Sequence, residues 1–167
     1  MHSIDRLKPL WRWGLMALFW GGLMNACAQA GNVPDQFFFS FGTEYSVEKS
    51  GQTATISYQP AWGDAQRPPV LGAQPEVKKI RLTKEAVQKI WRAIASVDFA
   101  PYQQLKPDDF DPTPPDMRHT EQLKLIVDAK TVVDWSEGYQ FLKPDLRRPL
   151  AEIEDTIREA FEASASK

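Results

Sequence analysis

The chain has 167 residues, of which 43% are hydrophobic and 25% are charged. Residues 31–167 hold 17 lysines and arginines against 21 aspartates and glutamates, a net charge of −4. This acidic balance argues against nucleic acid as a partner, because phosphate binding needs a basic surface. His119 is the only histidine after residue 30, which excludes a metal site built from several histidines. Neither a metal site nor a cofactor is expected.

The first 30 residues have the features of a secretion signal. A basic leader precedes an apolar run at residues 14–24, which is too short for a comfortable membrane span, and small residues follow it. The tripeptide Ala-Gln-Ala at residues 28–30 fits the small-x-small pattern of signal cleavage. We therefore predict a signal peptide over residues 1–30 and a mature chain that begins at Gly31.

Cys27 supports a second interpretation of the same segment. Residues 23–27 resemble the site at which bacterial lipoproteins are cut and acylated, although polar Asn25 departs from that pattern. A third alternative is an uncleaved anchor, because no charge occurs between Arg12 and Asp35. Export is common to all three: the protein is periplasmic or secreted, or is held at the membrane only through an N-terminal lipid or anchor.

The first predicted elements of the exported part are strands. Residues 37–41 form an aromatic run, and in residues 44–48 apolar and polar side chains alternate. Residues 49–52 have the composition of a tight turn around Gly51, and alternation resumes over residues 53–58. This predicts a hairpin, followed by a long loop at residues 59–77 that is rich in proline.

Residues 78–99 carry the strongest structural signal. Alternation over residues 79–82 predicts a short strand, and Thr83 is a suitable N-cap for the helix that follows. Pro101 limits the extension of that helix. The apolar face of the helix has the spacing of an amphipathic helix and consists of Val87, Ile90, Trp91, Ile94 and Val97.

The last third of the chain predicts two loops, a hairpin and a helix. Residues 100–120 form a second long loop, residues 123–135 a hairpin, and residues 138–145 a third irregular segment. A terminal helix is expected over residues 147–163, with Pro149 in its first turn. Its buried stripe consists of Leu150, Ile153, Ile157, Ala160 and Phe161.

Together these elements predict a single α+β domain over residues 31–167. Its mostly antiparallel sheet has about five strands, with two helices packed on one face. A helix that follows a strand through a tight connection is expected to run back along it. The three loops, at residues 59–77, 100–120 and 138–145, would then lie at one end of the domain as a three-loop rim.

The three-loop rim would gather aromatic and basic side chains, the residue types in which binding energy concentrates. A recognition surface there is therefore the functional hypothesis; the alternative, which the usual burial of large aromatics favours, is that these rings fold back onto the ends of the sheet as part of the core. The candidate binding residues are Trp62, Tyr102, Phe110, Arg118, His119, Tyr139 and Phe141.

Catalytic and metal-binding motifs are scarce. The chain has no G-x-S-x-G elbow, no glycine-rich phosphate loop and no cysteine nucleophile. His119, oriented by Asp116 or Glu121, is the candidate general base of a small hydrolase. The acidic residues 108–111 offer oxygen ligands for Ca²⁺, but Pro112 follows at once and the glycine of an EF-hand loop is missing, so a solvated acidic loop is favoured.

Three further features are interpreted as structural. Trp91 and Trp135 are expected in the core, one on the helix and one on a strand. The basic cluster at residues 78–84 is interpreted as a solvated strand edge rather than a site for an anionic partner. Lysines on an edge also discourage pairing between sheets.

The order of elements resembles small exported bacterial domains of unknown function. The resemblance rests on residues 80–85, the helix through Trp91 to Phe99, the hairpin 123–135 and the terminal helix from Leu150. It implies an envelope location without obvious enzymology. We therefore expect a non-catalytic binding or accessory protein of the cell envelope, whose partner is an envelope or extracellular protein. The alternatives are a small hydrolase and a structural envelope protein.

Overall fold

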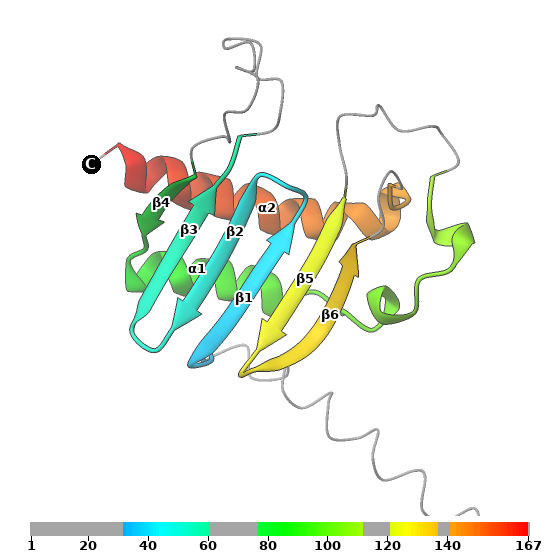
Figure 1. Ribbon diagram of the computed structural model, residues 1–167, viewed down its shortest axis with the longest axis horizontal. Helices are drawn as coiled ribbons and strands as arrows, with labels where there is room; N and C mark the ends of the chain where they lie inside the picture. Colours follow the sequence, from blue (N-terminus) through cyan, green and yellow to red (C-terminus); the bar gives the residue numbers. More distant parts are fainter. Residues whose placement is uncertain (1–31, 61–76, 112–120, 137–140, 167) are drawn as a thin grey trace, which may run out of the picture.

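The computed structural model describes residues 32–60, 77–111, 121–136 and 141–166 (Figure 1). In these residues six strands, two α-helices and two short 3₁₀ helices follow one another along the chain. Their bounds are β1 (Gln36–Phe41), β2 (Tyr45–Ser50), β3 (Thr53–Tyr58), β4 (Lys78–Arg81), α1 (Lys84–Ala95), η1 (Pro101–Gln104), η2 (Pro107–Asp109), β5 (Gln122–Val127), β6 (Lys130–Ser136) and α2 (Pro144–Ala165).

The strands form one antiparallel sheet in the order β4-β3-β2-β1-β5-β6, so the predicted α+β class is confirmed. It has six strands where about five were expected. Gly42 has a φ of +69°, which suits a turn that separates the aromatic run from the alternating segment after it. The long-range pairing of β1 with β5, in which Phe39 lies opposite Leu125, joins the two halves of the sheet.

Two hairpin turns have the backbone that their sequences require. Gly51 has a φ of +57° in the turn between β2 and β3, as predicted. Between β5 and β6, Asp128 and Ala129 have φ angles of 46° and 63°. Two consecutive left-handed residues make a type I′ turn, whose twist matches that of the strands it joins.

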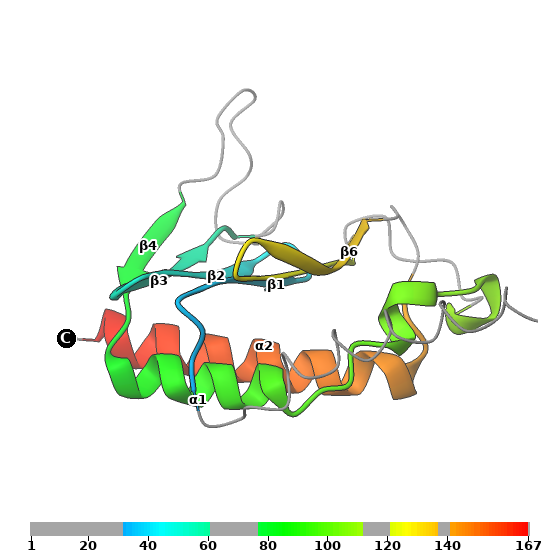
Figure 2. The same ribbon diagram turned by 90° about the horizontal axis from the view of Figure 1, so that it is seen from below.

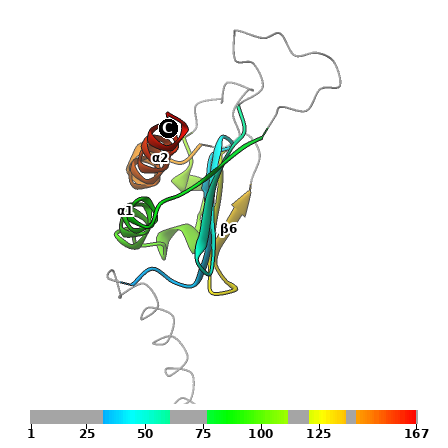
Figure 3. The same ribbon diagram turned by 90° about the vertical axis from the view of Figure 1, so that its left-hand side faces the viewer.

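Both α-helices cover the same face of the sheet and leave the other face open among the described residues (Figures 2 and 3). Thr83 caps α1 as predicted, because its hydroxyl accepts a hydrogen bond from the backbone N–H of Ala86 at 3.3 Å. The predicted stripe of α1 is buried, except that Val97 lies just beyond the helix and is half-buried.

α2 begins earlier than the sequence predicted. The helix starts at Pro144, so Pro149 lies inside it rather than in its first turn. Proline tolerates the first helical position, which Pro144 occupies, and this explains the earlier start. At Pro149 the missing N–H removes one bond of the helical ladder. The predicted stripe is buried in full and consists of Leu150, Ile153, Ile157, Ala160 and Phe161.

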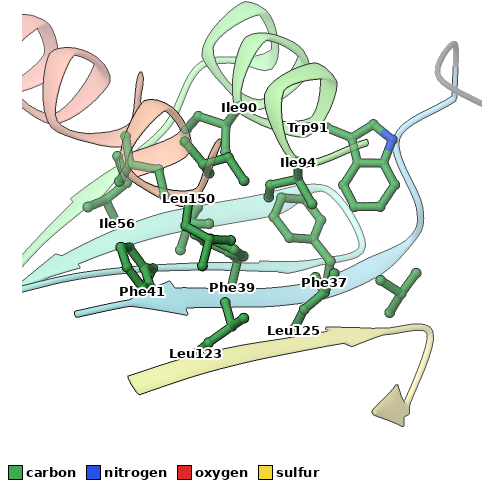
Figure 4. Close-up of a cluster of buried hydrophobic side chains, with 14 of the residues drawn as sticks. Phe37, Phe39, Phe41, Ile56, Ile90, Trp91, Ile94, Leu123, Leu125 and Leu150 are labelled. Atoms are coloured by element: carbon green, nitrogen blue, oxygen red, sulfur yellow. The ribbon is translucent and has the colours of Figure 1, made fainter. Parts of the chain in front are cut away.

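The core lies between the sheet and the two helices (Figure 4). Phe37, Phe39 and Phe41 point from β1 into it, and each is at most 3% exposed. Trp91 packs against Phe37 with ring centroids 5.3 Å apart, which confirms its predicted place in the core. Its indole N–H is buried and has no hydrogen-bond partner among the described residues.

The path of α1 differs from the expectation. α1 crosses the strands obliquely, from the β4 side towards β5, instead of running back along β4 (Figure 1). The segment after it therefore reaches β6 at the opposite edge of the sheet. Alternating strand directions still place the end of β3, the starts of β4 and β5 and the end of β6 at one end of the sheet. The strand ends that flank the loops of the predicted rim thus lie at one end of the sheet but towards its opposite edges.

Candidate binding groove at the β6 edge

A groove of about 560 Å³ lies between the outermost strand β6 and the segment that carries η1 and η2. Residues 102–107 and Phe110 line one wall, and residues 131–135 of β6 line the other. Ligand pockets commonly have volumes of about 300–1,000 Å³. We call this feature the β6 groove.

Two stacked aromatic rings join the walls of the β6 groove. The rings of Phe110 and Trp135 lie with centroids 5.4 Å apart and planes inclined by 29°. Both side chains are half-buried, so each also has surface left to offer to a ligand. Offset aromatic pairs contribute roughly 0.5–1.5 kcal/mol beyond the burial of their area.

η1 is tied to both its neighbours by side-chain hydrogen bonds. The hydroxyl of Tyr102 donates to the carbonyl oxygen of Leu146 in α2 at 2.8 Å. Burial raises the pKa of Tyr102, and the charge of Asp98 adds to this effect. The side-chain amide of the next residue, Gln103, donates to the carbonyl oxygen of Val132 in β6 at 2.8 Å. These contacts fix the wall of the groove that does not belong to the sheet.

Residues 109–111 are held against the segment that leads into α2. The backbone N–H of Asp111 donates to the carbonyl oxygen of Phe141 at 2.8 Å, and that of Lys143 donates to the carbonyl oxygen of Asp109 at 2.9 Å. Phe110 itself forms an isolated β-bridge with Leu142. The two segments therefore act as a short ribbon at the end of the groove.

The buried side chain of Glu121 holds this ribbon in place through hydrogen bonds from Leu142 and Arg147. Its side chain is 4% exposed, and it is the only buried polar or charged residue that the described parts of the chain contain. One carboxylate oxygen accepts from the backbone N–H of Leu142 at 2.9 Å, and the other accepts from Nε of Arg147. Both oxygens are occupied, so Glu121 positions the segment rather than serving as a free base.

The structure brings together part of the predicted rim. Tyr102 and Phe110 line the β6 groove, and Phe141 lies beside it through its bond to Asp111. Tyr102 is 5% exposed, so most of its ring belongs to the core. The remaining predicted residues lie outside the described residues: Trp62, Arg118, His119, Tyr139 and the candidate lipidation site Cys27.

Trp135 and Gln103 were not among the predicted site residues, and Glu121 was expected to orient His119 rather than to bind Leu142 and Arg147. Trp135 was interpreted as core because it falls in an alternating strand, and alternation alone does not show that the strand is the outermost one. Gln103 and Glu121 make contacts 29 and 21 residues away along the chain, which no local pattern encodes. The available signal was a large aromatic residue, Trp135, near the end of the second strand of the predicted hairpin.

The acidic stretch has a structural role at η2. The carboxylate of Asp109 accepts a hydrogen bond from the backbone N–H of Lys106 at 2.7 Å, which closes the turn. Within the four described ranges, no group of three or more histidine, cysteine, aspartate or glutamate side chains is placed to hold a metal ion.

A second electrostatic feature lies under the turn between β1 and β2. Burial raises the pKa of Glu154 in α2, and the nearby carboxylate of Glu44 raises it further, while Arg147 opposes the change. A Cβ at Gly42 would make only an ordinary contact with the Glu154 carboxylate, at 3.6 Å, so the φ of +69° rather than lack of space favours glycine there.

No family model, curated protein or solved structure matches this chain. The described helices include none that is long and apolar enough to cross a membrane.

Proposed function

We propose that this chain is an exported, non-catalytic binding domain of the bacterial cell envelope, and that its binding site is the β6 groove. The observation that supports the proposal is the stacked pair Phe110–Trp135 inside a groove beside an outermost strand. Half-buried aromatic rings in a concave site are typical anchors for a partner, because they bury apolar area while losing little conformational freedom.

The charged and hydroxyl groups near the groove favour binding over catalysis. Asp134 pairs with Lys124 at 2.7 Å in an exposed ion pair, and Tyr102 donates its hydroxyl proton to a backbone carbonyl. Glu121 has both oxygens engaged. Among the described residues of the groove, none of these groups is poised as a free acid or base.

Affinity capture tests the proposal. The purified protein is immobilised and exposed to the envelope fraction of its native host, beside two variants, Phe110→Ala and Phe38→Ala. Phe38 is the matched control, because it is also a half-buried phenylalanine but lies on β1 outside the groove. A partner that is retained by Phe38→Ala and lost by Phe110→Ala supports the groove. A partner that both variants retain contradicts it.

Export is tested by the mass of the mature chain. Secretion with cleavage before Gly31 predicts an unmodified chain of residues 31–167, whereas lipidation predicts an acylated Cys27 at the new N-terminus. A full-length chain that stays in the cytoplasm would contradict export altogether.

A further inference from the structure

The outer side of β6 has backbone groups that no strand pairs. The type I′ turn at Asp128 and Ala129 is closed by the pair Val127–Lys130, which exchanges hydrogen bonds. Hydrogen-bonded and non-bonded pairs alternate along an antiparallel ladder, so the N–H and C=O of Thr131 point away from β5. By the same alternation along β5, Lys124 and Asp134 form a non-bonded pair. The N–H and C=O of Asp134 therefore also point away from β5.

Little of this outer side is covered. In the described parts of the chain, the outer backbone of β6 takes part in one hydrogen bond, from the side chain of Gln103 to the carbonyl of Val132. Thr131 and Asp134 are exposed. The β6 groove runs along this side, over residues 131–135.

The groove supplies an apolar wall next to these polar backbone groups. Val133 and Trp135 face the helix side of the sheet, where Leu105 and Phe110 lie across the groove from them. An occupant therefore meets backbone donors and acceptors along its length and aromatic or aliphatic surface on one of its faces. An extended peptide presents this combination, because its side chains alternate between two faces and its amides lie between them.

We infer that the occupant of the β6 groove is a short extended polypeptide segment, which adds to β6 as a further strand and directs apolar side chains at alternate positions towards Phe110 and Trp135. This inference rests on the proposed binding function and names the chemistry of its partner. A compact apolar molecule would use the rings but would leave the outward amides of Thr131 and Asp134 to water.

The edge itself argues against a second copy of the sheet as the occupant. The pairing of β5 with β6 shifts register between Leu125 and Ile126, which is a β-bulge. A bulge bends the strand locally, so a short segment that follows the bend fits where the long, straight strand of a second sheet does not. The opposite edge, β4, carries three basic residues among its four and would repel its own copy.

Selection from a displayed library of random 12-residue peptides tests the inference on the purified protein. Selected sequences are synthesised, and their dissociation constants are measured for the unchanged protein, Phe110→Ala and Phe38→Ala. Each peptide is then methylated at one backbone nitrogen at a time, which removes that N–H. We expect Phe110→Ala to weaken binding at least tenfold and Phe38→Ala to change it less than twofold. Methylation at alternate positions should abolish binding, while methylation at the positions between should leave it intact.

The other outcomes are distinct. Peptides that depend on Phe110 but show no alternation under methylation overturn strand addition and leave the proposed groove function standing. Peptides that bind Phe110→Ala as well as the unchanged protein overturn both, because the groove is then not their site. A library that yields no binding peptide overturns the inference of a polypeptide ligand, and the capture experiment then decides separately whether the groove binds at all.

Discussion

The two edges of the sheet differ in length, charge and cover. β4 has four residues, of which Lys78, Lys79 and Arg81 are basic and exposed, and in the described part of the chain none of them makes an ion pair. β6 has seven residues with Val132, Val133 and Trp135 near its centre, and it borders the groove.

An unpaired edge is a template for another strand, so a protein must either block it or use it. β4 is short and basic, which favours an edge that is blocked against pairing, because burying lysine and arginine against a second sheet is unfavourable. β6 is longer, has three apolar residues near its centre and lines a groove, which favours an edge that is used for binding. Under the proposed function, unpaired backbone is therefore blocked at one edge of the sheet, β4, and used for binding at the other, β6.

The largest expected effect is a loss of stability on removing Glu121, whose side chain holds the segment at the end of the β6 groove. Glu121→Ala leaves the buried N–H of Leu142 without its acceptor, and lost hydrogen bonds to a charged group cost about 2–3 kcal/mol. Chemical denaturation should show this fall in the free energy of unfolding. Lys79→Ala on β4 is the control and should stay within about 0.5 kcal/mol. If both variants lower the free energy of unfolding by the same small amount, Glu121 does not stabilise the β6 side of the domain more than Lys79 stabilises β4.

Removing the positive charge of β4 should allow this edge to pair with the β4 edge of a second copy. Lys79→Val/Arg81→Val leaves the backbone unchanged but adds β-branched side chains, and we expect self-association at least tenfold tighter by sedimentation equilibrium. Lys143→Val/Arg148→Val removes the same charge from exposed positions in and next to α2 and should not have this effect. Equal association of both double variants would show that net charge, rather than the β4 edge, controls it.

A smaller effect is expected where η1 touches β6. Gln103→Ala removes the bond to the Val132 carbonyl and should lower the free energy of unfolding by about 0.5 kcal/mol, because the contact is exposed. Gln104 is the matched control: it is the next residue, is also exposed, and its side chain makes no hydrogen bond among the described residues. If Gln104→Ala has the same effect, the Gln103 contact does not secure the wall of the groove.

The smallest effect concerns Glu154, which lies between the two edges. Because burial raises its folded pKa above the ordinary 4.5, its ionisation opposes folding at neutral pH. Glu154→Gln should therefore raise the melting temperature at pH 7. As the pH falls through the raised pKa towards 4.5, the carboxyl of Glu154 becomes protonated in the folded protein. The gain in melting temperature should therefore shrink over this range. A gain that does not depend on pH would contradict the assignment to this group, and peptide binding at β6 should not change.

The sequence predicted the local elements better than their arrangement. Thr83, the α1 stripe and the turn at Gly51 follow from side-chain periodicity and backbone preference, which act over a few residues. The place of β1 between β2 and β5 depends on pairs such as Phe39–Leu125 that lie far apart along the chain, and no local pattern encodes them.

The candidate site could be predicted only in part, for the same reason. Tyr102 and Phe110 were identified as aromatic loop residues, but their partner Trp135 looked like a core residue until the strand order showed that β6 is outermost. The oblique path of α1, set by packing against the sheet and α2, determines that η1 reaches β6 rather than the β3–β4 corner. Predicting the groove needs that tertiary geometry.

Amide hydrogen exchange, measured residue by residue at both edges with and without a selected peptide, tests most directly whether β6 is the binding edge. We expect exchange to slow at Thr131 and Asp134, whose amides acquire a strand partner, and not to change at Lys79 and Arg81 on β4. Protection at β4, or no new protection at β6 when the peptide is bound, would contradict the assignment of β6 as the binding edge.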